Sequence, residues 1–215
     1  MIASILKLGS KYQFDDLRKE AIDVLHHICD GDKQLSPSNL ENHVHIYRGI
    51  LIDMANLTAE HGLVNLLPVI LLSIASYRKN PLHAIVEGKQ RPDGSTATLD
   101  LALMKTVLLG RQKLYADYIA YRFSWIHETD ERCHSIDACM DIKRRAALRI
   151  FPLGTVCTHD VVAAGWVESW GRGLCKNCLD DAQEVYRDGL DRIWTALPSY
   201  FGLPTWEELR NTVEY

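Results

Sequence analysis

The segments Cys133-His-Ser-Ile-Asp-Ala-Cys139 and Cys175-Lys-Asn-Cys178 are the most informative part of the chain. They place two cysteine pairs roughly forty residues apart, a spacing typical of one tetrahedral Zn²⁺ that joins two chain segments. A Cys-x-x-Cys in the first turn of a helix suits such a site, because the positive end of the helix dipole favours thiolates. The sequence therefore predicts a structural zinc site formed by Cys133, Cys139, Cys175 and Cys178.

The residues leave other interpretations of these cysteines open. The gap between Cys133 and Cys139 is longer than the roughly two to four residues of common zinc sites. His134, Cys157 or His159 could replace one of the four ligands. All six cysteines could instead be free thiols, some of them in the core. A thioredoxin-like redox site is disfavoured, because no strand pattern precedes the Cys-x-x-Cys pair.

Composition and charge are those of an ordinary folded protein. The chain has 215 residues, of which 47% are hydrophobic and 24% charged, so it resembles neither a disordered nor a membrane-spanning sequence. The most apolar run, Leu63 to Ala75, is shorter than the ~20 residues that span a bilayer. A net charge of −4 gives no overall attraction to nucleic acid or anionic lipid. We expect one large or two small domains and no membrane segment. The charge disfavours a nucleic-acid partner but leaves a local basic patch open.

The N-terminus and the cysteine content bear on localisation. The first residues lack the charged, apolar and cleavage regions of a signal peptide. Six cysteines without a secretory signal indicate a reducing compartment, where thiols are free or bound to metal. The expectation is an intracellular protein of the cytoplasm, the nucleus or both.

Apolar residues recur at helical spacing along the chain, and no alternating β-branched run is bounded by turns. The predicted fold class is therefore all-α, an irregular multi-helix bundle. Turn-forming residues from Gly88 to Ser95 predict a boundary between two packed helical lobes, residues 1–88 and 96–215. The zinc site belongs to the second lobe.

Three helices of the second lobe have clear apolar faces. The first, capped by Thr98, is predicted to bury Leu103, Val107, Gly110, Leu114, Tyr118, Tyr121 and Trp125. The second, capped by Ser135, is predicted to bury Ile136, Cys139, Met140, Ala146, Ala147 and Ile150. The last is predicted to end at Pro198, after a stripe of Leu179, Ala182, Tyr186, Leu190, Ile193 and Leu197. Thr205 and Glu208 then predict a capping box for a terminal turn.

The run Ile5-Leu-Lys-Leu-Gly-Ser-Lys-Tyr-Gln-Phe-Asp-Asp-Leu-Arg-Lys-Glu-Ala21 resembles the segment that follows the core of BTB/POZ domains in a large family of mushroom-forming fungi. Ser10 stands where that family usually has histidine. Further similar motifs are Ala55-Asn-Leu57, Leu67-Pro68, Arg91-Pro-Asp-Gly-Ser95, Leu109-Gly-Arg111, Leu174-Cys-Lys-Asn-Cys178, Arg192-Ile-Trp-Thr-Ala-Leu-Pro198 and Phe201-Gly-Leu203. Together these motifs cover nearly the whole chain.

This resemblance implies a helical region that follows a BTB core, with a BTB tail and BACK-like helices in the first lobe. The family carries paired cysteines at these places, which adds support for zinc. The BTB core itself is absent before Met1, so its homodimerisation and its contact with cullin-type ubiquitin ligases are not carried over. The implied function is that of a non-enzymatic protein-protein interaction or scaffold module of a BTB-type adaptor, whose protein partner the sequence does not name.

Two other functions remain open from the residues. The strip Lys143 to Arg149 could serve a zinc-containing transcriptional regulator that binds nucleic acid, but Asp137 and Asp141 on the same helix favour a solvated face. An enzyme with a helical cofactor pocket is the third possibility. No catalytic residue and no small-molecule substrate is evident, since the chain lacks a Gly-rich phosphate loop after a strand.

Overall fold

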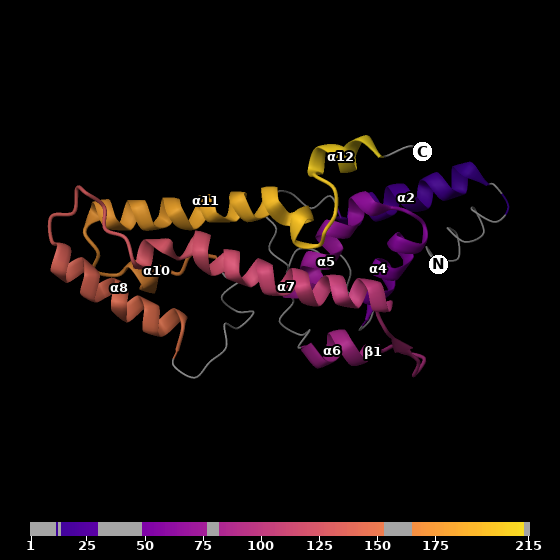
Figure 1. The fold of residues 1–215 in the computed structure, drawn as a ribbon, viewed down its shortest axis with the longest axis horizontal. Helices are drawn as coiled ribbons and strands as arrows, with labels where there is room; N and C mark the ends of the chain where they lie inside the picture. Colours follow the sequence, from indigo (N-terminus) through magenta and orange to yellow (C-terminus); the bar gives the residue numbers. More distant parts are fainter. Residues whose placement is uncertain (1–11, 13, 30–48, 77–81, 153–164, 213–215) are drawn as a thin grey trace. The chain divides into compact units, whose positions relative to one another are not determined.

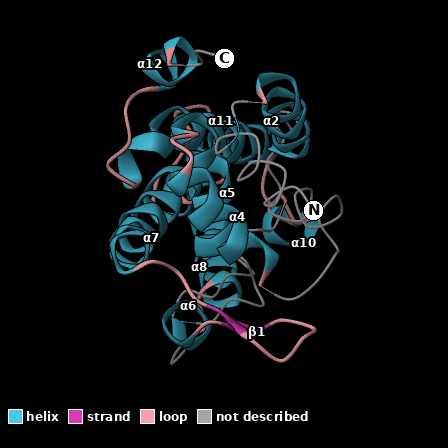
Figure 2. Ribbon diagram, turned by 90° about the vertical axis from the view of Figure 1, so that its right-hand side faces the viewer, coloured by secondary structure: helices cyan, strands magenta, loops and turns pink. Residues whose placement is uncertain are grey.

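The computed structural model describes residues 12, 14–29, 49–76, 82–152 and 165–212. This part of the chain is mostly helical (Figure 1), and its strands are confined to one short hairpin (Figure 2). The predicted all-α fold class is therefore confirmed. The helix predicted to run from about Ser36 to Tyr47 lies outside the described residues. Among the described helices, none combines the length and the apolar character needed to cross a bilayer.

The chain divides into two compact units. Unit 1 comprises Met1–Arg111 and Pro198–Tyr215, and unit 2 comprises Gln112–Leu197. The divisions fall inside two long helices, whereas turn chemistry predicted a boundary at residues 88–95. The elements that lie wholly in unit 1 are α2 (Asp15–Cys29), α4 (Ile50–Glu60), η1 (Val64–Leu66), α5 (Leu67–Ser76), α6 (Leu82–Glu87), β1 (Lys89–Gln90), β2 (Thr96–Ala97) and α12 (Trp206–Asn211).

Helix α5 forms the core of unit 1. All of its residues are buried, as the apolar composition of this segment predicts. Its two buried hydroxyl groups need hydrogen-bond partners, because an unsatisfied polar group in the core is costly. Ser73 donates to the carbonyl of Val69 at 2.9 Å, and Ser76 donates to that of Leu72 at 2.6 Å. Both bonds stay within the helix, so α5 can be buried on every side.

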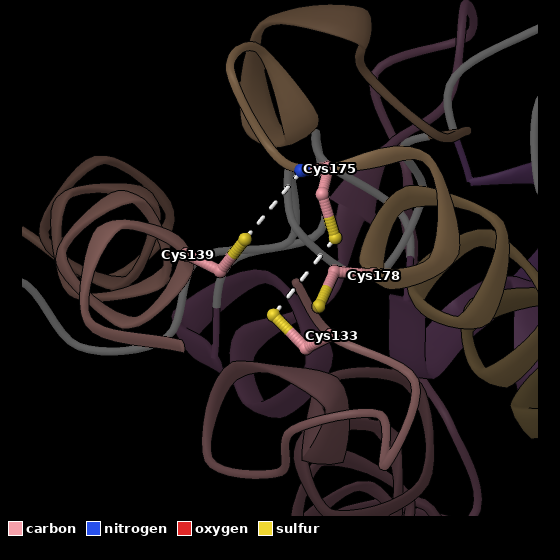
Figure 3. A group of neighbouring side chains, drawn as sticks. All are labelled: Cys133, Cys139, Cys175 and Cys178. Carbon is pink, nitrogen blue, oxygen red and sulfur yellow. Dashed lines mark hydrogen bonds between the residues drawn. The ribbon is translucent and has the colours of Figure 1, made fainter. Parts of the chain in front are cut away.

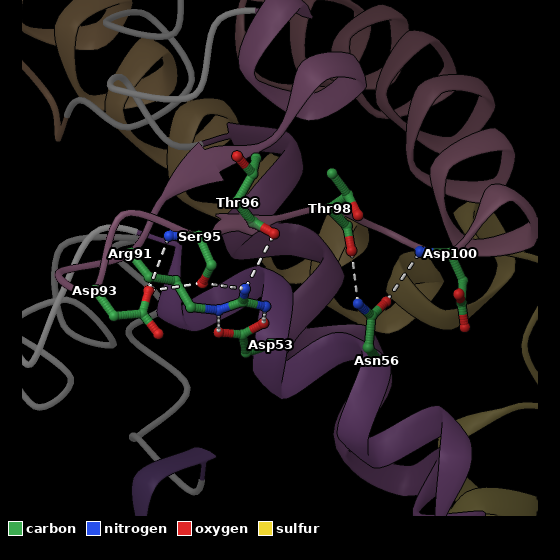
Figure 4. A network of polar contacts seen from close by, with 8 residues as sticks. All are labelled: Asp53, Asn56, Arg91, Asp93, Ser95, Thr96, Thr98 and Asp100. Atoms are coloured by element: carbon green, nitrogen blue, oxygen red, sulfur yellow. Dashed lines mark hydrogen bonds and ion pairs between the residues drawn. The ribbon is translucent and has the colours of Figure 1, made fainter.

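The turn-forming segment after α6 is an antiparallel hairpin in which Lys89 pairs with Ala97 and Gln90 with Thr96. The Arg91 guanidinium at its turn makes two parallel hydrogen bonds to the Asp53 carboxylate on α4, at 2.8 and 2.6 Å (Figure 4). The predicted loop at residues 88–95 thus contains a short strand and is anchored to α4 within unit 1.

A second polar contact ties α4 to the residues that lead into α7 (Leu101–Arg122). The side-chain amide of Asn56 donates to the carbonyl of Thr98 at 2.7 Å and accepts from the backbone N–H of Asp100 at 3.0 Å (Figure 4). Helix α7 begins three residues after Thr98, the predicted cap. The amide therefore satisfies backbone groups at the start of this helix.

The C-terminal helix α12 of unit 1 begins with the predicted capping box. The backbone N–H of Glu208 donates to the Thr205 hydroxyl at 3.3 Å, and the Thr205 backbone N–H donates to the Glu208 carboxylate at 2.8 Å. Two backbone donors that the first turn leaves without a helical partner are satisfied in this way. This prediction is confirmed.

Unit 2 contains η2 (Ser124–Ile126), α8 (Ile136–Ile150) and α10 (Glu168–Gly171), and it shares α7 and α11 (Lys176–Tyr200) with unit 1. In unit 2, α7 and α11 run antiparallel to each other (Figure 1). A Cβ atom at Gly189 on α11 would lie 2.7 Å from the Tyr121 carbonyl oxygen on α7. The two backbones therefore approach too closely for a larger residue at this position.

The predicted apolar stripe of α11 is largely buried, with Ala182, Tyr186, Ile193 and Leu197 inside. Three details of the predictions for α7 and α11 are wrong. Pro198 lies inside α11, which ends only at Tyr200. Tyr121 of α7 is exposed, and Trp125 lies in η2 beyond the end of that helix.

An aromatic cluster fills the core of unit 2. Its rings contact one another mostly edge to face, at centroid distances of 5.2–5.7 Å, and they belong to Phe123, Trp125, Phe151, Trp166, Trp170 and Tyr186. The guanidinium of Arg122, which is 4% exposed, lies 3.7 Å from the centroid of the Tyr186 ring. Stacking on aromatic rings lets this charged group remain in the core.

Candidate metal centre

The four predicted ligands come together in unit 2. Cys133 lies in the loop before α8, Cys139 in the first turn of α8, Cys175 immediately before α11, and Cys178 in the first turn of α11 (Figure 3). Their four sulfur atoms all lie within 4.8 Å of one another. All four are free thiols. Segments from two helix starts and one loop therefore converge on a single point.

The spacing of the sulfur atoms suits a tetrahedral ion. A Zn–S bond of about 2.3 Å with tetrahedral angles implies sulfur-to-sulfur distances of about 3.8 Å. The Sγ atoms of Cys133 and Cys175 are 3.9 Å apart. Four thiolates are also the donor set that borderline and soft metal ions prefer. The four cysteines could thus hold a metal ion with little movement of their side chains.

A turn presents Cys133 to the cluster. The carboxylate of Asp130 accepts a hydrogen bond from the backbone N–H of Arg132 at 2.6 Å, and the Asp130 carbonyl accepts one from that of Cys133 at 2.9 Å. The side chain of Asn177 on α11 donates to the Arg132 carbonyl at 2.7 Å. Neither Asp130 nor Asn177 is among the predicted site residues, although an aspartate two residues before a turn amide is a recognisable Asx pattern.

The start of α8 presents Cys139. Ser135 occupies the N-cap position, as predicted, but its side chain makes no capping hydrogen bond. Its carbonyl accepts from the backbone N–H of Cys139 at 2.9 Å. The Cys139 sulfur accepts from the backbone N–H of Cys175 at 3.4 Å (Figure 3). This bond joins the start of α8 directly to the start of α11.

Gly173 shapes the turn that leads into α11. Its φ of +96° lies in the region that favours glycine. A Cβ atom there would also lie 3.1 Å from the Cδ1 atom of Ile142 on α8. A side chain at this position would therefore strain the backbone and press on α8, two residues before the predicted ligand Cys175.

The surroundings of the thiols differ. The backbone N–H of Cys178 beside the sulfur of Cys175 lowers the pKa of Cys175 to about 6. Burial raises the pKa of Cys178 to about 12 and also raises that of Cys139. The start of α11 therefore favours the thiolate of Cys175, as predicted. Burial has the larger effect on Cys178 and raises its pKa instead. A bound cation would replace the protons of the buried thiols, because metal ligation requires thiolates.

The three alternative ligands that the sequence offers are His134, Cys157 and His159. Cys157 and His159 lie outside the described residues. His134 follows Cys133 in the same loop, but its side chain is exposed and is not part of the four-sulfur cluster. Its backbone N–H contributes to lowering the pKa of Cys175. Among the described residues, the cluster consists of the four cysteines alone.

No family model matches this chain, and no curated protein or solved structure matches it either.

The basic strip of α8 does not form one exposed surface. Lys143 is fully buried, and its amine donates to the carbonyl of Glu128. Arg144 forms an ion pair with Asp141 at 3.1 Å. Arg149, in the last turn of α8, donates to the carbonyl of Ser169 at 3.4 Å. Burial thus removes Lys143 from the strip, whereas Arg144, Arg145 and Arg149 remain exposed.

Unit 2 also contains an apolar groove of about 370 Å³. It is lined by Ile119, Ala120, Phe123, Ser124, Ile126, His127, Glu128, Ala147, Leu148 and Phe151. His127 and Glu128 are its titratable groups, and the other lining residues are apolar except for Ser124.

Proposed function

We propose that Cys133, Cys139, Cys175 and Cys178 bind one Zn²⁺ as a structural site. The observation that carries the proposal is the convergence of four free thiols from three places in the chain, with all sulfur atoms within 4.8 Å. Four protein ligands fill the coordination sphere of a tetrahedral ion, so no position is left for a substrate or a catalytic water. A structural role follows from this closed ligand set.

The bound ion would hold the loop before α8, the first turn of α8 and the start of α11 together. Hydrogen bonds from Asn177 to Arg132 and from Cys175 to Cys139 already link these parts. Because such a site does not exist in the unfolded chain, its binding free energy contributes to folding. Metal removal would therefore loosen this end of unit 2 first.

The function that these features support best is a zinc-stabilised, non-enzymatic module for protein-protein interaction, the helical part of a BTB-type adaptor. Two arguments support it. The closed four-cysteine set suits a structural ion, and the motifs from Ile5 to Leu203 resemble those of the BTB-containing fungal proteins. Nucleic-acid binding is the weaker alternative, because Lys143 is buried and Arg144 is paired with Asp141.

Metal content tests the zinc site. Protein purified without added metal should contain one zinc per chain by elemental analysis, and a serine at any of the four positions should abolish it. Cys157→Ser is the matched control and should retain the metal. Zinc loss in that control would mean that Cys157 is a ligand, and a bound iron would show as a coloured thiolate spectrum. A protein without metal, or retention of zinc in Cys178→Ser, would refute the proposal.

Affinity capture tests the scaffold role. The zinc-loaded chain should retain a partner that then binds directly and at defined stoichiometry when both proteins are pure. Binding that depends on unit 2 should weaken in the metal-free Cys178→Ser chain. Failure of the loaded chain to bind any purified candidate would count against the scaffold role. Salt-dependent binding to DNA that weakens in Arg144→Ala and Arg145→Ala would instead favour the alternative.

A further inference from the structure

The four cysteines of the cluster are not equally accessible. Cys139 and Cys178 are buried, at 1% and 0% exposure, whereas Cys133 and Cys175 are partly exposed. The sulfur atoms of these two partly exposed residues are also direct neighbours, 3.9 Å apart (Figure 3). An oxidant arriving from solvent therefore meets two adjacent sulfurs from different segments before it reaches the buried pair. Oxidation of cysteine depends on such access.

We propose that this pair makes the metal centre a peroxide-sensitive switch, in which hydrogen peroxide joins Cys133 to Cys175 as a disulfide and the Zn²⁺ is released. The inference rests on the proposed zinc site and adds a regulation to it. Two ligands are too few to hold a structural zinc ion, so Cys139 and Cys178 would take up protons from water and become thiols as the ion leaves.

The reaction balances with hydrogen peroxide as the two-electron oxidant. One thiolate attacks a peroxide oxygen, so that an S–O bond forms, the O–O bond breaks and hydroxide leaves. The second thiolate attacks the resulting sulfenic acid, so that the S–S bond forms and a second hydroxide leaves. In total, two thiolates and one hydrogen peroxide give one disulfide and two hydroxide ions. The zinc ion keeps its charge throughout, and a dithiol reductant reverses the change.

The geometry favours this pair over others. A disulfide requires the two sulfurs to approach from 3.9 Å to about 2.05 Å. Cys133 lies in a turn and outside any helix, so it can make this movement without breaking helical hydrogen bonds. Cys139 lies within α8 and is buried. Oxidation would thus keep the loop bonded to the start of α11 and free the first turn of α8 from the centre.

Zinc release and disulfide mapping test the proposal in the wild-type chain. The zinc-loaded protein is treated with increasing hydrogen peroxide, released zinc is measured with a chromogenic chelator, and disulfides are mapped by mass spectrometry after alkylation. One zinc should be released for each disulfide formed, and the disulfide should join Cys133 and Cys175. Zinc release with a disulfide between Cys175 and Cys178, or with none, would overturn the switch and leave the zinc site intact as a proposal.

A pair of histidine variants provides the matched control. Cys133→His and Cys139→His both leave three cysteines and one histidine, a ligand set common in structural zinc sites. Peroxide should release zinc from Cys139→His as from wild type and several-fold more slowly from Cys133→His. Equal rates would contradict the role of the accessible pair. If neither variant loads zinc, the wild-type disulfide map still decides, and a wild-type protein without zinc would refute both proposals.

Discussion

The Sγ atom of Cys175 lies 3.9 Å from the Sγ atom of Cys133, although 42 residues separate the two along the chain. The contact joins a turn held by Asp130 to the residue immediately before α11, and Cys139 adds the start of α8. The starts of α8 and α11 therefore meet at the four-cysteine cluster. Elsewhere in unit 2, side-chain packing around the aromatic cluster holds the helices together.

Chelation should loosen this side of unit 2 before the rest of the protein. Without the ion, the four thiols regain their protons and the turn loses its strongest link to α11. We expect faster amide hydrogen exchange in residues 130–142 and 173–180 after metal removal. The hairpin of β1 and β2 in unit 1 is the internal control and should exchange at an unchanged rate. An equal increase in both units would contradict a local structural role for the ion.

Gly173→Ala should weaken both stability and metal binding. The left-handed φ costs a non-glycine residue about 1–2 kcal/mol, and the added Cβ would press on Ile142. We expect a lower free energy of unfolding and a weaker zinc affinity, measured by denaturant titration and by competition with a chelator. Gly165→Ala is the matched control in unit 2, because nothing lies within 4 Å of a Cβ atom there and its φ is not in the glycine region. Equal effects of the two variants would refute the role of Gly173.

The ion pair between Arg91 and Asp53 should stabilise unit 1 measurably. Its two parallel hydrogen bonds and its partial burial, with side chains 31% and 25% exposed, make it stronger than a surface pair. We expect Arg91→Lys, which cannot bind both oxygens in this way, to lower the free energy of unfolding by about 1 kcal/mol. A double-mutant cycle with Asp53→Asn should give a favourable coupling energy. The exposed pair of Asp141 and Arg144 serves as the control and should show almost none.

The capping box of α12 should make the C-terminal helix sensitive to acid. The backbone N–H of Thr205 lowers the pKa of the Glu208 carboxylate below its ordinary 4.5. A lowered pKa means that the stabilisation is present above pH 4.5 and is lost as the pH falls through the folded value. Thr205→Ala should cost about 1 kcal/mol at neutral pH. Glu208→Gln should remove most of the acid dependence of hydrogen exchange in α12, whereas Glu207→Gln should leave it unchanged.

Local rules predicted the elements whose causes lie close together in the sequence. The capping box needs only Thr205 and Glu208, and the position of Cys178 in a first helical turn follows from the apolar stripe of α11. The four cysteines converge as their spacing predicts, because a Cys-x-x-Cys and a second cysteine pair indicate a shared metal site from sequence alone. The metal identity and the function stay predictions.

Features that depend on distant partners could not be predicted in this way. Lys143 was assigned to an exposed basic strip, but its amine finds the Glu128 carbonyl and the side chain is buried. The apolar pattern predicts that Ile136 is buried, but this side chain is 58% exposed at the first residue of α8. The anchoring of Arg91 to Asp53, 38 residues away, has no local signature. In each case, tertiary contacts decide which face of an element is covered.

The unequal spacing of the four cysteines has a consequence for the order of folding. Cys175 and Cys178 are only three residues apart, so an unfolded chain can already hold a metal ion between them. Capture of Cys133 and Cys139 then closes one long loop, and the entropic cost of that closure rises by only about 0.6 kcal/mol for each doubling of loop length. We therefore expect relatives of this chain to vary in length between residues 139 and 175 with little effect on stability, and to keep the short spacing that lets assembly begin.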